Sequence, residues 1–205
     1  MLRFVNQLLF NNVPCEIGTT TKFSWGKRIE WYKEFLNNNI NDKVCVVDGW
    51  DMLFFGTTEE LEQKVDRPVI FSAERNCWPD KDKMEKYPNC STPWRFVNGG
   101  AFAGNAKDLL EILNGMPDVN VPDDDQRYYT DCYLNGIGVL DTQCSLFHSL
   151  YNGNASDLVP RHGRYYNTLT KEMPCFIHGN GGSWRSREDI FWYNQPVQMY
   201  CGAGL

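Results

Sequence analysis

Apolar side chains recur at helical spacing in several stretches of the chain. Leu2, Val5 and Leu8, for example, are three residues apart and share one face of a helix. Thr57, followed three residues later by Glu60, forms a capping box, which typically opens a helix. Together these patterns predict helices over residues 2–11, 27–38, 59–65, 106–113 and 123–134.

Continuous apolar runs, rather than alternating ones, mark the strongest predicted strands. Residues 43–47 and 68–73 have the composition of strands buried on both faces inside a parallel sheet. The first run ends at Asp48 and the second at Glu74, while a shorter run ends at His178. Further strands are predicted at 13–17, 95–104, 139–140, 165–166 and 175–178.

The alternation of these strands with helices predicts an α/β domain with a mostly parallel central sheet flanked by helices. The length of 205 residues fits one such domain. Ligands of open α/β sheets bind at the carboxyl ends of the strands. The two acids and the histidine that follow apolar strands are therefore the first candidates for function.

Composition excludes several classes of protein. Hydrophobic residues make up 42% of the chain, enough for a core, and no apolar run is long enough to span a membrane. The net charge of −6 argues against a nucleic-acid partner. None of the eight cysteines forms a CxxC pair, which disfavours a zinc finger or a redox motif. The first ten residues lack the pattern of a signal peptide.

Two loops at strand ends carry groups that suit a cation and an anion. Asp48 and Asp51 lie three residues apart, so both carboxylates can reach one hard cation; an Asx turn with a helix cap is the alternative. His178 precedes a Gly-Asn-Gly turn whose bare backbone can cradle a phosphate. The alternative is a capped turn with a surface histidine.

Three other features leave function and packing open. Helix capping and the helix dipole explain two of the three aspartates at 123–125, and the third favours a cation or a hydroxyl-rich ligand. Asn98-Gly99-Gly100 interrupts a strand, either to meet a ligand or as a β-bulge. Trp50 and Trp78 can stack on a ligand or anchor their loops.

Six short blocks occur in one order along the chain: KVCVVDGWDMLF, PVIFSAERNCWPD, RFVNGGAFAGNA, PDDDQRYYT, LDTQCSLFHSLY and PCFIHGNG. In this order they resemble the glycosyltransferase domain of the multifunctional procollagen lysyl hydroxylases and its stand-alone relatives. The resemblance covers residues 2–181. It implies a GT-A-like domain over residues 1–181, with the first strand of the family missing, followed by an aromatic tail over 182–205.

The resemblance also implies an activity. Members of this family use Mn²⁺ and a UDP-sugar, and transfer glucose or galactose, with retention of configuration, to hydroxylysine or galactosyl-hydroxylysine of a collagen-like polypeptide. The alternatives are a GT-A transferase for another acceptor and a catalytically weak or silent GT-A module. The family implies the endoplasmic reticulum lumen, whereas the missing signal peptide leaves a truncated fragment, a viral protein or a cytoplasmic one open.

Individual residues take implied roles from the same blocks. The implied Mn²⁺ ligands are Asp48, Asp51 and His178. On the donor side the resemblance implies Lys27, Gly179 and Asn180 near the diphosphate, Trp50 in the place of a tyrosine that stacks on uracil, and Gln126 towards the sugar. On the catalytic and acceptor side it implies Trp78, Asn98, Asp124 and Asp125.

Overall fold

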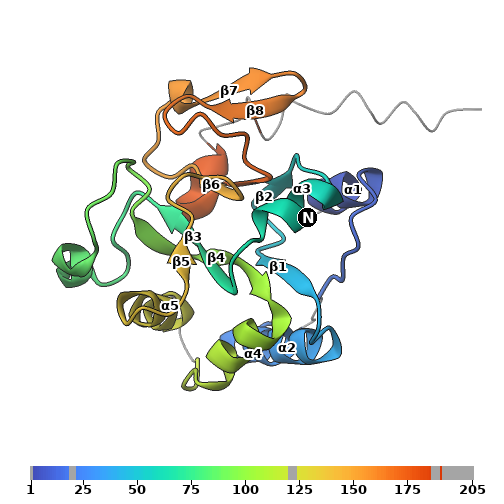
Figure 1. Ribbon diagram of the computed structural model, residues 1–205, viewed down its shortest axis with the longest axis vertical. Helices are drawn as coiled ribbons and strands as arrows, with labels where there is room; N and C mark the ends of the chain where they lie inside the picture. Colours follow the sequence, from blue (N-terminus) through green and yellow to red (C-terminus); the bar gives the residue numbers. More distant parts are fainter. Residues whose placement is uncertain (1, 19–21, 120–123, 186–189, 191–205) are drawn as a thin grey trace, which may run out of the picture.

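A four-stranded sheet lies at the centre of the computed structural model, which describes residues 2–18, 22–119, 124–185 and 190 (Figure 1). Its strand order is β1-β4-β3-β5, with β1 at Lys43–Val47, β4 at Phe96–Asn105, β3 at Val69–Glu74 and β5 at Val139–Leu140. β1 and β3 both run antiparallel to β4, and β5 pairs parallel with β3. The α/β fold is confirmed, but the expected mostly parallel sheet is wrong.

The burial of β1 explains this error. Val44 and Val46 point into one hydrophobic core, whereas Cys45 and Val47 pack against a second core on the opposite face of the sheet. A strand covered on both faces is apolar at every position, whichever way its neighbours run. The apolar run therefore predicts burial correctly and strand direction incorrectly.

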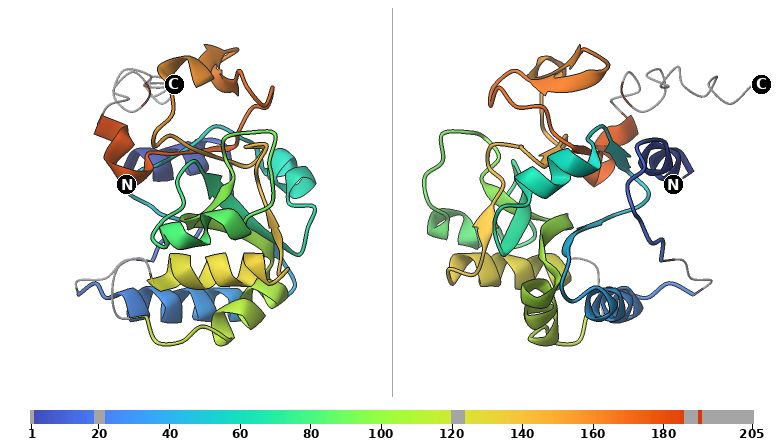
Figure 2. Two further views of the ribbon diagram at one scale, coloured as in Figure 1. Left: turned by 90° about the vertical axis from the view of Figure 1, so that its left-hand side faces the viewer. Right: turned by 45° about the vertical axis from the view of Figure 1, so that its right-hand side comes forward.

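Three helices cover one face of this sheet: α2 (Trp25–Asn38), α4 (Ala106–Asn114) and α5 (Asp124–Leu134) (Figures 1 and 2). All three were predicted to within two residues at each end over the described part of the chain; Asp123 lies outside it. Their apolar faces meet the sheet in one core, which includes Ile29, Tyr32, Leu36, Leu109, Leu113 and Tyr129.

A smaller sheet and a helix cover the other face. The smaller sheet has the order β2-β9-β6, formed by Met52–Phe54, Phe176–His178 and Phe147–Ser149, and α1 (Leu2–Phe10) packs beside it. The second core combines these elements with Ala101 and Ala103 from the back of β4. Strand β2 and strand β6 were not predicted, and residues 13–17 form no strand.

The remaining elements are peripheral. They are α3 (Thr58–Lys64), the hairpin of β7 (Leu158–Arg161) and β8 (Arg164–Asn167), and the 3₁₀ turns η1 (Lys81–Lys86), η2 (Ala155–Asp157) and η3 (Asn180–Arg185). Thr57 is the N-cap of α3, because its hydroxyl accepts a hydrogen bond from the Glu60 N–H at 3.2 Å. The Glu60 carboxylate pairs with Arg164 and Lys64 instead of closing the reciprocal half of the predicted capping box. No helix in the described ranges has the length and apolar character that a membrane crossing requires.

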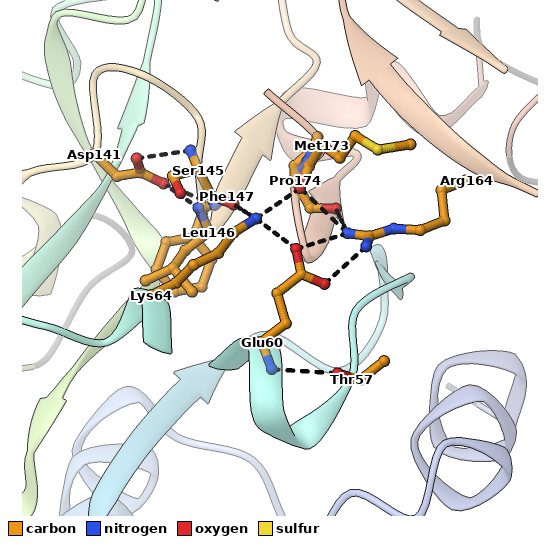
Figure 3. A network of polar contacts seen from close by, with 10 residues as sticks. All are labelled: Thr57, Glu60, Lys64, Asp141, Ser145, Leu146, Phe147, Arg164, Met173 and Pro174. Atoms are coloured by element: carbon orange, nitrogen blue, oxygen red, sulfur yellow. Dashed lines mark hydrogen bonds and ion pairs between the residues drawn. The ribbon is translucent and has the colours of Figure 1, made fainter. Parts of the chain in front are cut away.

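A polar network joins α3 to the segment that leads into β9 (Figure 3). Glu60 accepts hydrogen bonds from both terminal nitrogens of Arg164, at 2.7 and 3.1 Å. Lys64 donates to the carbonyl oxygen of Met173 at 2.8 Å and forms an ion pair with Glu60. Nearby, the buried Asp141 accepts the N–H groups of three successive residues, Ser145 to Phe147. The network thus holds the start of the strand that ends at His178.

Candidate active site

Strand pairing brings Asp48, Asp51 and His178 together. Met52 lies opposite His178 in the β2–β9 register, so Asp51 is adjacent to the imidazole. The distance from Asp51 Oδ1 to His178 Nε2 is 3.3 Å, and the Gly179 N–H donates to the Asp51 carbonyl oxygen at 2.7 Å. Asp48 follows β1, and one ligand atom from each of the three residues lies within 4.8 Å of the others. The predicted convergence of these residues is confirmed.

Gly100 makes this convergence possible. A Cβ atom at Gly100 would lie 2.3 Å from His178 Cε1 and 3.0 Å from Asp48 Oδ2, so any side chain would push the imidazole away. Its neighbour Gly99 similarly admits Gln126, whose Oε1 accepts the Gly99 N–H at 2.8 Å. The register between β3 and β4 shifts at this point, so the Asn-Gly-Gly segment interrupts the regular pairing of the two strands.

Asn98 fixes the orientation of the imidazole. Its Nδ2 donates to Glu74 at 3.1 Å, and its Oδ1 accepts the N–H of Gly100 at 3.1 Å, so the two ends of the amide are distinguished. The same Oδ1 lies 3.0 Å from His178 Nδ1, which therefore carries a hydrogen. Nε2 is thereby directed at the two acids, as second-sphere hydrogen bonds direct metal-binding histidines.

Glu74 connects three of the predicted site residues. Its carboxylate, which is buried, accepts hydrogen bonds from the side-chain amides of Asn98, Gln126 and Asn180 at 3.1, 3.0 and 3.2 Å. Sequence reasoning noticed Glu74 as an acid at the end of a strand but gave it no role. Its partners come from β4, α5 and η3, so no local pattern could reveal the cluster.

Arg28 links the two acidic parts of the site. Its guanidinium pairs with Asp48 at 3.2 Å and also with Asp125, which is buried at the start of α5. The neighbouring Lys27, which the resemblance implied as a diphosphate contact, is exposed to solvent. In the sequence, Arg28 could have been found from its place on the first turn of α2, directly after Lys27.

The electrostatics of the site couple His178 to Asp51. Burial alone lowers the pKa of His178, but its hydrogen bond and charge pairing with Asp51 raise that pKa above the ordinary value of 6.5. Burial raises the pKa of Asp51, and the hydrogen bond with His178 lowers it below the ordinary value. Burial also raises the pKa of Glu74, although the amides of Asn98 and Gln126 oppose this. A cation at His178 therefore competes with a proton.

The donor set fits a divalent cation that accepts oxygen and nitrogen ligands. Two carboxylates supply hard oxygens, and the imidazole supplies one nitrogen whose direction is already fixed by Asn98. Carboxylate oxygens suit Mg²⁺ and Mn²⁺, and mixed coordination with imidazole is compatible with Mn²⁺. The residues present therefore fit the cation that the family resemblance implies.

Comparison with known families agrees with this geometry. The sequence profile of a family described as the PLOD GT domain, where GT denotes glycosyltransferase, matches residues 15–194. This match covers well over half of the chain.

The chain belongs to the PLOD GT domain family.

Curated relatives of this PLOD GT domain include viral and animal proteins. "Uncharacterized protein R699" of Acanthamoeba polyphaga mimivirus is 37% identical over 148 residues, which are 69% of this chain and 32% of that protein. Human "Multifunctional procollagen lysine hydroxylase and glycosyltransferase LH3" is 30% identical over 172 residues, 76% of this chain and 23% of that protein. Mouse "Procollagen-lysine,2-oxoglutarate 5-dioxygenase 1" is 29% identical over 205 aligned residues, which are 88% of this chain and 28% of that protein. The chain therefore spans between about a quarter and a third of the length of these relatives.

The other site residues predicted for this PLOD GT domain differ in whether they contact the residues around Glu74 and Asp51. Trp50, in the turn between β1 and β2, is 82% exposed, and Trp78 is 49% exposed. The carbonyl oxygen of Trp78 accepts from Gln126 Nε2 at 2.8 Å, which places its loop beside the cluster. The N–H of Gly179 is engaged with Asp51 and is not available to a diphosphate. The side chain of Asp124 and the tail from residue 191 lie outside the described residues.

Proposed function

We propose that this PLOD GT domain transfers glucose or galactose from a UDP-hexose to hydroxylysine or galactosyl-hydroxylysine of a collagen-like polypeptide, with Mn²⁺ and with retention of configuration. Membership of a glycosyltransferase family supports the reaction class. The names of the procollagen lysine hydroxylase relatives support the acceptor. The convergence of Asp48, Asp51 and His178 is the observation that carries the metal dependence.

Departure of UDP sets the main electrostatic demand of this reaction. The bond between the anomeric carbon and the diphosphate oxygen breaks, and negative charge develops on that oxygen. A divalent cation held by Asp48, Asp51 and His178 would supply the charge stabilisation that UDP needs as a leaving group. Arg28, already paired with Asp48, adds a permanent positive charge beside the same cluster.

The polar residues that adjoin the three candidate metal ligands suit the transferred sugar. Asp125 is held in place by Arg28 and can orient hydroxyl groups or stabilise positive charge at the anomeric carbon. Asn98 and Gln126 are fixed by Glu74, so the polar wall of the site is preorganised. The exposed rings of Trp50 and Trp78 are available to stack on the uracil and on a sugar.

Replacement of Asp51 tests this proposal. In Asp51→Ala, Mn²⁺-dependent binding of UDP is expected to be lost, because the cation loses one carboxylate and His178 loses its partner. Isothermal titration with UDP, with and without Mn²⁺, measures the effect. Asp66→Ala removes an exposed acid away from the cluster and serves as the matched control. Equal UDP affinity in Asp51→Ala and the parent protein would place the cation elsewhere.

A further inference from the structure

A hollow of about 310 Å³ lies beside the Glu74 cluster and has no part in the function proposed above. Residues 150–153, which follow β6, form one wall, and residues 181–183 of η3 form the other. We call it the Tyr151 hollow. Its volume is at the lower end of the range for small-molecule sites, enough for one compact ligand.

Tyr151 presents a fixed aromatic ring to this hollow. The ring packs on the backbone of Gly181, where a Cβ atom would lie 2.7 Å from Tyr151 Cδ2. The Tyr151 N–H donates to Asn180 Oδ1 at 3.0 Å, which holds the residue at its base. The side chain is nevertheless 40% exposed. A ring that is anchored on one side and open on the other is ready to stack on a ligand.

The polar lining of the hollow is neutral. No acidic or basic side chain lines it in the described part of the chain, so neither a phosphate nor a cation finds a counter-charge there. Asn152 donates from its side chain to Asn76 Oδ1 at 2.7 Å, which joins the hollow to the loop that carries Trp78. The bare backbone of Gly182, where an added Cβ atom would meet nothing within 4 Å, allows close approach of a ligand. An aromatic ring, amides and glycine backbone together suit a neutral, hydroxyl-rich ring.

Asn180 connects the hollow to the candidate active site. Its Oδ1 faces Tyr151, whereas its Nδ2 donates to Glu74, which in turn holds Asn98 and, through it, His178. A ligand in the hollow is therefore separated from the cation cluster by only a few side chains.

We propose that the Tyr151 hollow is an acceptor-sugar subsite, which binds the galactosyl unit already attached to a glycosylated acceptor. This inference rests on the proposed transferase function. It assigns to Tyr151 the stacking contact with that sugar and to Asn152 the adjacent hydrogen bonds. Binding in the hollow selects galactosyl-hydroxylysine over unmodified hydroxylysine as the acceptor.

Two measurements on the full chain test the subsite. Saturation-transfer NMR with methyl β-galactoside reports binding directly, and UDP release with galactosyl-hydroxylysine peptide reports the acceptor KM. Tyr151→Ala is expected to abolish the NMR signal and to raise the acceptor KM about tenfold, with the KM for UDP-hexose unchanged. Tyr151→Phe keeps the ring and is expected to retain binding. Phe10→Ala removes a 67% exposed ring on α1 and is the matched control.

Asn152→Gly provides a second variant that keeps the backbone relaxed, because Asn152 has a φ of 58° that glycine adopts readily. Asn152→Gly is expected to raise the KM for the acceptor and to leave the KM for the UDP-hexose donor unchanged.

An unchanged acceptor KM in Tyr151→Ala, with UDP release intact, overturns the subsite but leaves the transferase proposal standing. If Tyr151→Ala raises the KM for the unmodified hydroxylysine peptide as much as the KM for the galactosylated one, the sugar subsite is also overturned, because the hollow then binds the peptide and not the sugar. Absence of Mn²⁺-dependent UDP binding in the parent protein overturns the transferase proposal itself, and the galactoside signal then tests the hollow alone.

Discussion

Single side chains in this domain serve two neighbours at once, and Asn98 is the clearest case. One end of its amide binds Glu74, while the other accepts from Gly100 and His178. The family resemblance implies that Asp48 and His178 share a cation, whereas a common sheet edge does not bring them together, because β1 and β9 belong to different sheets. The sequence cannot predict the amide contacts, which depend on side chains from three distant segments.

Asn98→Ala is expected to weaken Mn²⁺ binding about 10- to 100-fold, because His178 loses the hydrogen bond that directs its Nε2 towards the acids. Electron paramagnetic resonance of free Mn²⁺ during titration measures this affinity without nucleotide. Asn105→Ala, at the far end of the same strand, is expected to keep the parental affinity. An unaltered affinity in Asn98→Ala would mean that packing alone orients the imidazole.

Arg28 and Lys27 offer a second comparison at this scale. Arg28→Gln is expected to lower the transfer rate about 10- to 100-fold, because Asp125 loses the partner that positions it. Lys27→Gln is expected to change the rate by less than about twofold, since Lys27 is exposed. UDP release at saturating donor and Mn²⁺ measures both rates. A larger loss in Lys27→Gln would instead support the diphosphate contact that the family resemblance implies for Lys27.

At the level of helices and strands, an element is predicted more accurately from the sequence when its pattern of apolar positions is longer. Helices α2 and α4 repeat their apolar spacing over several turns, and the sequence places them well. Strands β2 and β6 have three residues each, too few for a period to emerge, and they form because β9 pairs with both. Strand direction is likewise a property of the partner and not of the strand.

The network around Glu60 yields a prediction for α3. Glu60→Gln is expected to lower the free energy of unfolding by about 1 kcal/mol, because it weakens a bidentate pair with Arg164 that is partly shielded from water. Urea denaturation followed by circular dichroism measures the change. Glu62→Gln, which alters an exposed acid on the same helix, is the matched control.

The difference in the free energy of unfolding between the parent protein and Glu60→Gln depends on pH, because it depends on the charge of Glu60. Burial by itself raises that pKa, but Arg164 and Lys64 lower it below its ordinary value of 4.5. A carboxyl whose pKa is lower in the folded state stabilises the protein above the ordinary pKa. The difference between parent and Glu60→Gln is therefore expected in full above pH 4.5 and to fade as the pH falls below it. A difference that persists at lower pH would show that packing, not charge, is responsible.

On the scale of the whole molecule, one sheet separates two hydrophobic cores. Helices α2, α4 and α5 close the first core, and α1 with the smaller sheet closes the second (Figure 2). The sequence correctly predicts an α/β domain with both faces of its sheet buried. The separation of the β2-β9-β6 sheet from the central sheet was not predicted, because it arises from pairing between residues 52–54 and 176–178, more than a hundred positions apart.

Nucleotide binding should be visible as a change in the stability of the entire domain. UDP at about 100 times its Kd stabilises a folded protein by about 2.7 kcal/mol, which corresponds to a rise in Tm of about 5–10 °C for a chain of this size. The rise is expected with Mn²⁺ present and not in its absence. Differential scanning fluorimetry measures it, and no rise under either condition would favour a catalytically silent module.

The origin of the three converging ligands has a mechanical consequence. Asp48 follows β1 of the larger sheet, whereas Asp51 directly precedes β2, and His178 ends β9, in the smaller sheet. An ion held by all three would add a cross-link between the two sheets, beside the short segment of chain that already connects β1 to β2. Chelation would therefore loosen the seam between the layers as well as empty the site, and amide exchange along β2 and β9 would accelerate before that of β1.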